Sequence, residues 1–177
     1  MITVNQKGAQ RMTSATIATE LGDIEIDLFD ESAPKATANF IKLANDGFYD
    51  DVVFHRVIPG FVAQGGDGQY GKKSSLERGR VGTGGPGYTI QDEPVTTPYK
   101  RGTVAMARSS QPNSVGSQFF IVLDDKDGAV LSSANTYQII GNVTSGMETA
   151  DAIFAASGGV EQPTNPVPIT TATVANP

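Results

Sequence analysis

The stretch FHRVIPGFVAQGGD, at residues 54–67, constrains the fold most, because two short apolar runs flank a turn signal. Pro59 and Gly60 supply that signal, so the chain is expected to bend there. Short apolar runs that end at glycines are typical of β-strands. Arg56 lies in the first run and Gln64 near the end of the second. The planar fork of an arginine among apolar residues suits recognition of a carbonyl or carboxylate, and the alternative is a structural ion pair.

Alternation along the first run assigns its side chains to two faces. Phe54, Arg56 and Ile58 are expected to share one face, and His55 and Val57 the other. His55 would then point away from the face that carries Arg56. We interpret it as a structural histidine, hydrogen-bonded in the interior or at the floor of a groove, and not as a catalytic group.

A second segment, GSQFFIV at residues 116–122, has the same character. Its alternation places Gln118 and Phe120 on one face and Phe119 and Ile121 on the other. The two segments therefore each present a glutamine next to aromatic residues. Such apolar residues on strands are usually core, so a binding role needs a further argument.

These two segments, together with GTVAMA at residues 102–107, resemble the cyclophilin family of peptidyl-prolyl cis/trans isomerases, and in particular its bacterial single-domain members. The resemblance extends from about residue 15 to about residue 174. It implies a mainly β fold, a closed eight-stranded antiparallel β-barrel capped by two α-helices. It also implies an enzyme that accelerates rotation about X-Pro peptide bonds and assists protein folding, with the substrate groove outside the barrel.

The resemblance assigns roles to individual residues of this chain. Arg56 matches the catalytic arginine of the family. The walls of the family's proline pocket match three apolar residues, Phe61, Val62 and Phe120. The position of Val62 often carries a methionine in the family.

Four further residues match groups that contact the substrate backbone. Gln64 and Gln118 match the polar side chains that hold it. Ala107 and Arg108 match the two residues that lie along the peptide, and the second of these is usually an asparagine in the family.

The departures from the family pattern lie in GAVLSSANTYQIIG, at residues 128–141. Tyr137 takes the position of a histidine, and Leu131 matches the leucine of the pocket. Val130 stands where the family has tryptophan or phenylalanine, and the chain contains no tryptophan at all. Because cyclosporin binding in the family relies on that aromatic residue, we expect weak or absent binding of cyclosporin A with catalysis retained.

Composition excludes several classes of function. The chain has 177 residues, which suggests one domain with a substantial core. Its 13 basic and 19 acidic residues give a net charge of −6, which argues against nucleic acid as a partner. It has no cysteine and one histidine, so neither a disulfide nor a zinc site is expected, and no cofactor.

The ends of the chain bear on location and domain limits. No apolar stretch approaches the ~18 residues of a membrane span, and the first residues contain no apolar core like that of a signal peptide. We therefore expect a cytoplasmic monomer. Residues 1–12 are expected to be a loose N-terminal extension, and residues 13–177 a single cyclophilin-like domain.

Periodicity predicts the remaining elements. Residues 13–19 and 22–29 form a predicted hairpin whose alternating pattern turns Glu25 and Asp27 outward as a solvated face, not as an acid–base pair. A helix is predicted to open at residues 32–34, with Ser32 as N-cap, and to end at residues 45–47, with Gly47 after its end. A second helix is predicted over residues 145–155. Strands are predicted at residues 102–107, 116–123, 137–143 and 169–174, and a polar loop at residues 124–128.

Residues 68–87 are predicted to form a loop, of which residues 70–81 resemble an insertion. Gly82, Gly84 and Gly87 match the spacing of a nucleotide-binding GxGxxG, but Pro86 and the extended residues after it do not fit a helix start. The loop carries a local positive patch of Lys72, Lys73, Arg78 and Arg80, which is interpreted as solvated; the alternatives are that the loop gates the groove or contacts a partner. The alternative to an isomerase is a catalytically weak proline-peptide binding module or chaperone, which the altered segment between Val130 and Tyr137 keeps open.

Overall fold

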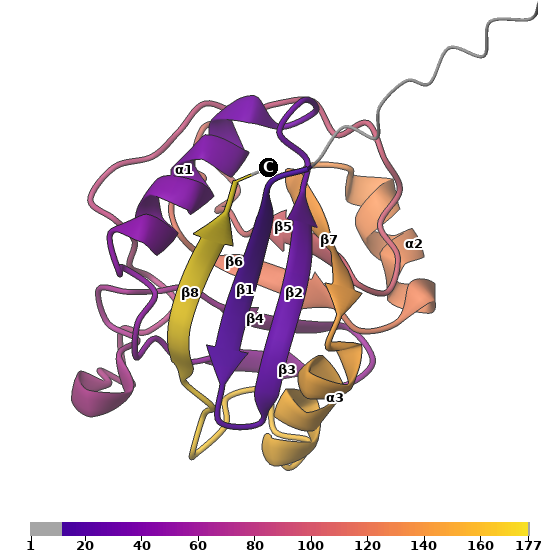
Figure 1. Ribbon diagram of the computed structural model, residues 1–177. Helices are drawn as coiled ribbons and strands as arrows, with labels where there is room; N and C mark the ends of the chain where they lie inside the picture. Colours follow the sequence, from indigo (N-terminus) through magenta and orange to yellow (C-terminus); the bar gives the residue numbers. More distant parts are fainter. Residues whose placement is uncertain (1–11, 177) are drawn as a thin grey trace, which may run out of the picture.

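The protein is described by a computed structural model that covers residues 12–176. The expected N-terminal extension lies outside the described residues, apart from Met12. The described part of the chain is mainly β, with one curled antiparallel sheet and flanking helices (Figure 1). Its strands are β1 (Ser14–Thr19), β2 (Gly22–Leu28), β3 (Arg56–Ile58), β4 (Val62–Gly65), β5 (Thr103–Met106), β6 (Phe119–Val122), β7 (Ile139–Ser145) and β8 (Ile169–Ala175).

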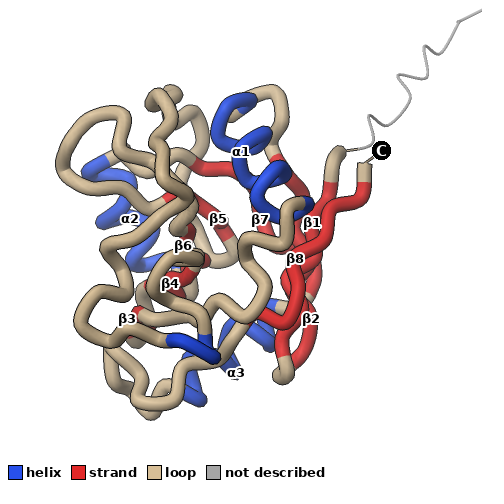
Figure 2. Tube along the Cα trace, turned by 90° about the vertical axis from the view of Figure 1, so that its left-hand side faces the viewer, coloured by secondary structure: helices blue, strands red, loops and turns tan. Residues whose placement is uncertain are grey.

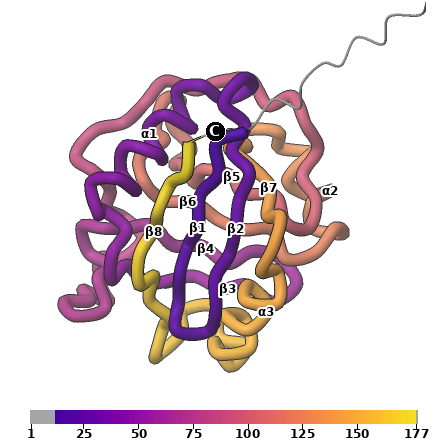
Figure 3. The backbone as a smooth tube through the Cα atoms, viewed as in Figure 1, coloured from indigo at the N-terminus to yellow at the C-terminus, as the bar shows by residue number. Residues whose placement is uncertain are grey.

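The sheet has eight strands in the described chain, in the order β3-β4-β6-β5-β7-β2-β1-β8. It curls so that β8, β1 and β2 lie in front of β3 and β4, which cross behind them (Figure 3). The end strands β3 and β8 do not pair as strands, so a fully closed barrel is not confirmed. Main-chain hydrogen bonds cross part of the seam, from Phe54 N to Val167 O at 2.9 Å and from Ile169 N to Val52 O at 2.8 Å.

Residues on the two faces of the sheet belong to two separate apolar clusters. On β6, Phe119 and Ile121 lie in the interior cluster inside the curl, together with Ala63 of β4. Phe120 and Val122 lie in a second cluster on the outer face. The predicted alternation of residues 116–122 is confirmed, and it follows from the two-residue period of a strand.

Two helices lie near opposite ends of the curled sheet, as expected (Figure 1). Helix α1 (Pro34–Asn45) contributes Phe40, whose ring meets Phe119 edge to face with centroids 5.7 Å apart. Helix α3 (Met147–Ala156) buries Ala150 and Ile153 in the same interior cluster. The predicted positions of both helices along the sequence are close to the observed ones.

The N-terminus of α1 corrects one prediction, because Ser32 does not cap it. The N-cap residue is Ala33, and it makes no side-chain hydrogen bond. The carboxylate of Glu93 instead accepts hydrogen bonds from Lys35 N at 2.8 Å and Ala36 N at 2.9 Å. A carboxylate satisfies two otherwise unpaired N–H groups and complements the helix dipole. The cap comes from a distant loop, so local sequence gives no sign of it.

A third helix, α2 (Asp125–Ala134), replaces the predicted polar loop at residues 124–128. Asp124 is its N-cap, and its side chain accepts a hydrogen bond from Lys126 N at 2.8 Å. The helix was missed because only Gly128 and Leu131 are buried, so it shows almost no apolar periodicity. Gly128 lies so close to Tyr99 that a Cβ there would be 2.2 Å from the Tyr99 carbonyl oxygen.

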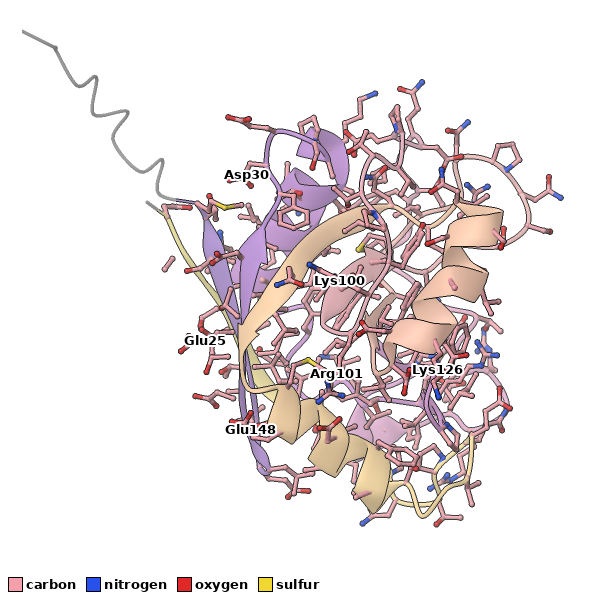
Figure 4. The ribbon with its side chains drawn as sticks, turned by 90° about the vertical axis from the view of Figure 1, so that its right-hand side faces the viewer. Glu25, Asp30, Lys100, Arg101, Lys126 and Glu148 are labelled. Carbon is pink, nitrogen blue, oxygen red and sulfur yellow. The ribbon has the colours of Figure 1, made fainter. Side chains whose placement is uncertain are left out.

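Two other predictions meet different outcomes. Glu25 and Asp27 lie on the outer side of β2, and Figure 4 shows Glu25 pointing away from the sheet, as the solvated-face interpretation requires. Phe54, in contrast, does not share a face with Arg56. Strand β3 begins only at Arg56, and Phe54 before it turns into the interior cluster with Val57.

Long loops run across the side of the molecule where β3 and β4 lie (Figure 2). The longest of them spans residues 66–102 and contains a short 3-10 helix, η1 (Lys73–Ser75). None of the helices within residues 12–176 has the length and apolar character that a membrane span requires.

Candidate active site

Strand register brings three of the predicted site residues into one row. Arg56 of β3 is the cross-strand partner of Gln64 on β4. Gln64 is in turn the partner of Phe120 on β6. Partners across antiparallel strands point to the same face, so a cation, an amide and an aromatic ring lie side by side on the outer face of the sheet.

A cavity of about 130 Å³ opens over this row. Its apolar walls come from six of the predicted residues, Phe61, Val62, Ala107, Phe120, Leu131 and Tyr137. Its polar lining comes from three more, Arg56, Gln64 and Arg108. The structure thus gathers around one cavity nine residues that the sequence spreads over more than eighty positions.

The far wall of the cavity depends on helix α2. Leu131 projects from this helix and is 5% exposed, in the same outer cluster as Val62 and Phe120. Val130, the next residue back, is 62% exposed and does not line the cavity. The helix therefore contributes Leu131 to the apolar wall of the cavity, whereas the side chain of Val130 adds nothing to that wall.

Gln118 lies beside the cavity and not in its wall. Its Oε1 accepts a hydrogen bond from Gln64 Nε2 at 3.0 Å. Its Nε2 donates to the carbonyl oxygens of Gly82 and Gly84, each at 2.9 Å. The same residues line a larger neighbouring cavity of about 690 Å³. Gln118 thus links Gln64 of the groove to the loop that contains Gly82 and Gly84.

The cationic groups of the site have defined partners. Arg56 Nε donates to Glu161 Oε1 at 2.8 Å, and the Arg56 side chain is 45% exposed. Arg108 is much less accessible, with a side chain 13% exposed that pairs with Asp92 at 3.1 Å. Of the two guanidinium groups, that of Arg56 is the one presented to solvent at the groove.

A profile of the family described as "Cyclophilin type peptidyl-prolyl cis-trans isomerase/CLD" matches residues 14–174 of this chain. The chain belongs to the cyclophilin family. A probable peptidyl-prolyl cis-trans isomerase of Brucella suis is 45% identical over 148 residues, which cover 80% of this chain and 74% of that protein. Peptidyl-prolyl cis-trans isomerase B of Bacillus subtilis is 46% identical over 129 residues, with 72% and 80% covered.

Solved cyclophilin structures show the same fold. A cyclophilin-type peptidyl-prolyl cis-trans isomerase of Cryptosporidium parvum superimposes with a TM-score of 0.79 at 30% identity, covering 94% of this chain and 100% of that one. A second structure of that protein, in the presence of the dipeptide Ala-Pro, gives a TM-score of 0.77 at 30% identity, covering 93% and 99%.

His55 in this cyclophilin is buried next to Arg56, as predicted, although Nδ1 has no hydrogen-bond partner among the described residues. Burial lowers the pKa of the imidazole to about 4; nearby Asp67 opposes this effect, and Arg56 adds to it. The ring is therefore neutral at pH 7. His55 and Arg56 both line an adjoining cavity of about 380 Å³, so they are not on fully separate sides.

Asp67 holds together the loop at residues 68–87. Its buried carboxylate accepts hydrogen bonds from the main-chain N–H groups of Gly82 at 2.8 Å and Gly84 at 2.9 Å. It also accepts from Gln69 N at 3.1 Å and Tyr70 N at 3.0 Å. Two N–H groups of the GxGxxG match are thus already bonded to a carboxylate, and this arrangement gives no support to the nucleotide-binding interpretation.

Glu161, Asp92 and the structural role of Asp67 were not predicted. Glu161 is 105 positions from Arg56, and no local pattern marks it. Asp67 directly follows Gly65 and Gly66 at the end of residues 54–67. An acidic residue in that position is a signal for a carboxylate that binds main-chain N–H groups. All three act through contacts between distant segments of this cyclophilin.

Proposed function

We propose that this protein is a peptidyl-prolyl cis/trans isomerase that acts on X-Pro bonds of peptides and of unfolded or partly folded proteins. The observation that carries the proposal is the row of Arg56, Gln64 and Phe120 on one face, under a small apolar cavity. The Cryptosporidium relative studied with Ala-Pro supports a proline-containing ligand.

The chemistry asked of such a site is modest. Rotation about an X-Pro bond has a barrier of about 18–20 kcal/mol, which arises from amide resonance. Lowering an exchange time of about 100 s to about 1 ms requires about 10⁵-fold acceleration, or about 7 kcal/mol. No covalent bond breaks, so the reaction needs no nucleophile, and the groups present need only bind and polarise.

Arg56 is proposed to act on the twisted state. In that state the prolyl nitrogen becomes pyramidal and gains a lone pair, which an N–H of Arg56 can meet with a hydrogen bond. The planar nitrogen of the ground state cannot accept such a bond, so the interaction favours the transition state alone. A preorganised donor of this kind contributes about 3–4 kcal/mol.

The other residues are proposed to fix the two sides of the bond. The proline ring would enter the cavity against Phe61, Phe120 and Leu131, which anchors one end. The amide of Gln64, held by Gln118, would bind the carbonyl or the chain beside it. Arg108 is proposed to contact the peptide through its main chain and stem, because its guanidinium is bonded to Asp92.

One observation favours the alternative of a binding module with weak turnover. Val130 is exposed on α2, and among the described residues the aromatic rings that line the cavity are those of Phe61, Phe120 and Tyr137. A shallower pocket would hold proline less firmly during rotation. The two functions differ in one measurable property, since a binding module binds proline peptides without accelerating their exchange.

Exchange of a short Ala-Pro peptide, followed by NMR with wild type and Arg56→Ala, tests the proposal. Fast exchange that falls by about 10²-fold or more in the variant, equivalent to about 3 kcal/mol, is the expected result. Lys42→Ala, which removes an exposed cation on α1 outside the cavity, serves as the control and should retain activity. Peptide binding without acceleration by the wild type would identify a binding module instead.

A further inference from the structure

The guanidinium of Arg56 lies at the end of a long, half-exposed side chain. Arginine carries substantial rotamer entropy, and a group that must meet one nitrogen in the transition state loses effectiveness if it samples many positions. Glu161 is the residue that restrains it, through the 2.8 Å hydrogen bond from Arg56 Nε to Glu161 Oε1.

Glu161 is itself fixed to the strand that carries Arg56. The carbonyl oxygen of Glu161 accepts a hydrogen bond from Val57 N at 2.9 Å. Its carboxylate accepts the hydrogen bond from Arg56, the residue before Val57. The main chain and side chain of one residue thus contact two consecutive residues of β3. This double contact gives the carboxylate a defined place relative to the groove.

The segment after Glu161 is held in turn by the inserted part of the loop at residues 68–87. Arg78 donates to the carbonyl oxygen of Thr164, and Lys73 donates to that of Pro166 at 2.7 Å. Basic residues that appeared only as a surface patch in the sequence therefore bond to the connector that follows Glu161. The loop is thus linked to Arg56 through these hydrogen bonds, the short chain segment between Glu161 and Thr164, and the Glu161 carboxylate.

The ion pair with Glu161 leaves the two terminal nitrogens of Arg56 available to a substrate. Glu161 engages Nε, and within residues 12–176 neither terminal nitrogen of Arg56 donates a hydrogen bond to the protein. Exposed ion pairs contribute little to folding stability. The geometry therefore suits orientation of the guanidinium plane better than it suits stabilisation of the fold.

We propose that Glu161 is a positioning residue for Arg56, braced by the inserted loop and setting the direction of the two terminal nitrogens toward the groove. This proposal rests on the proposed function of Arg56. The opposite possibility is that Glu161 competes with the substrate for the guanidinium, in which case its removal would raise activity.

The test compares Glu161→Ala and Glu161→Gln in peptide exchange, with kcat and KM measured separately by NMR. The alanine variant should lower kcat about three- to tenfold and leave KM nearly unchanged, since the guanidinium is still present but is less often in place. Glutamine keeps an oxygen acceptor of the same length and should restore most of kcat. Asp151→Asn, which weakens another exposed pair, that with Arg101, is the matched control and should not change kcat.

A spectroscopic readout separates positioning from a general structural effect. The Arg56 Nε–H resonance should be shifted and protected from exchange in the wild type, lose both properties in Glu161→Ala, and keep them in Asp151→Asn. If Arg56→Ala retains full activity, the proposed function of Arg56 fails. If Arg56→Ala is inactive while Glu161→Ala is unchanged or faster, the positioning role is overturned and the proposed function stands.

Discussion

The ring of Tyr137 meets the ring of Phe120 edge to face, with centroids 5.4 Å apart and planes at 85°. The Tyr137 carbonyl oxygen also accepts a hydrogen bond from the Tyr99 hydroxyl. The main chain of Tyr137 is thus held by Tyr99, and its ring by the contact with Phe120 at the wall of the cavity. An edge-to-face contact can replace the packing that another planar side chain would give there.

Truncation of this ring should weaken substrate binding. Tyr137→Ala removes one wall of the cavity and the ring that packs against Phe120, so KM for an Ala-Pro peptide should rise about two- to tenfold, equivalent to about 0.4–1.4 kcal/mol. Tyr137→Phe keeps the ring and is the matched control, expected to behave like the wild type. An equal loss in both variants would show that the hydroxyl, and not the ring contact, matters.

Cyclosporin A should inhibit this protein weakly or not at all. The position expected to carry an aromatic residue holds Val130, which is exposed on α2 outside the cavity lining. Inhibition should be absent at concentrations that fully inhibit a cyclophilin with tryptophan at that position, measured in the same exchange assay. Tight inhibition would mean that other residues, Tyr137 first among them, supply the missing contact.

The site was predictable where it depends on strand period and on a long ordered motif. Arg56, Gln64 and Phe120 lie on short strands, and pairing partners on strands share a face, so their sequence positions limit where they can point. Phe54 departed from the pattern because the strand starts after it, and the ends of strands are what a sequence pattern locates least accurately.

The parts that could not be predicted depend on contacts between distant segments. Helix α2 is nearly all solvent-exposed, so its sequence lacks an apolar stripe, although Asp124 is a recognisable N-cap. Glu93 at the start of α1 and Glu161 at Arg56 are acidic residues in loops. Which cation or N–H group such a residue meets is decided by the tertiary fold.

Loss of the Asp67 carboxylate should destabilise the protein strongly. The side chain is buried, and its removal leaves the N–H groups of Gly82 and Gly84 without their acceptor. Asp67→Ala should lower the free energy of unfolding in urea by about 3 kcal/mol or more. Asp46→Asn removes an exposed carboxylate that pairs with Lys42, and should change it by less than about 0.5 kcal/mol. A small effect at Asp67 would mean that water replaces the carboxylate.

The last prediction concerns His55, the single histidine of the chain, whose imidazole signals in NMR need no assignment by mutation. Burial lowers the pKa of this group in the folded protein to about 4, whereas an unfolded chain has about 6.5. The unfolded state therefore binds the proton more readily between these two values. The contribution of His55 to the free energy of unfolding is therefore fully present above pH 6.5 and is lost as the pH falls toward 4.

The difference in pKa corresponds to about 3 kcal/mol of unfolding free energy lost between pH 6.5 and pH 4. Carboxylates also titrate in this range, so the measurement compares the wild type with His55→Gln by urea unfolding at several pH values. The variant should lack this part of the pH dependence, so the gap between the two proteins should narrow as the pH falls. A histidine pKa of 6 or above, with parallel pH profiles for the two proteins, would show that water reaches the ring and solvates its charged form.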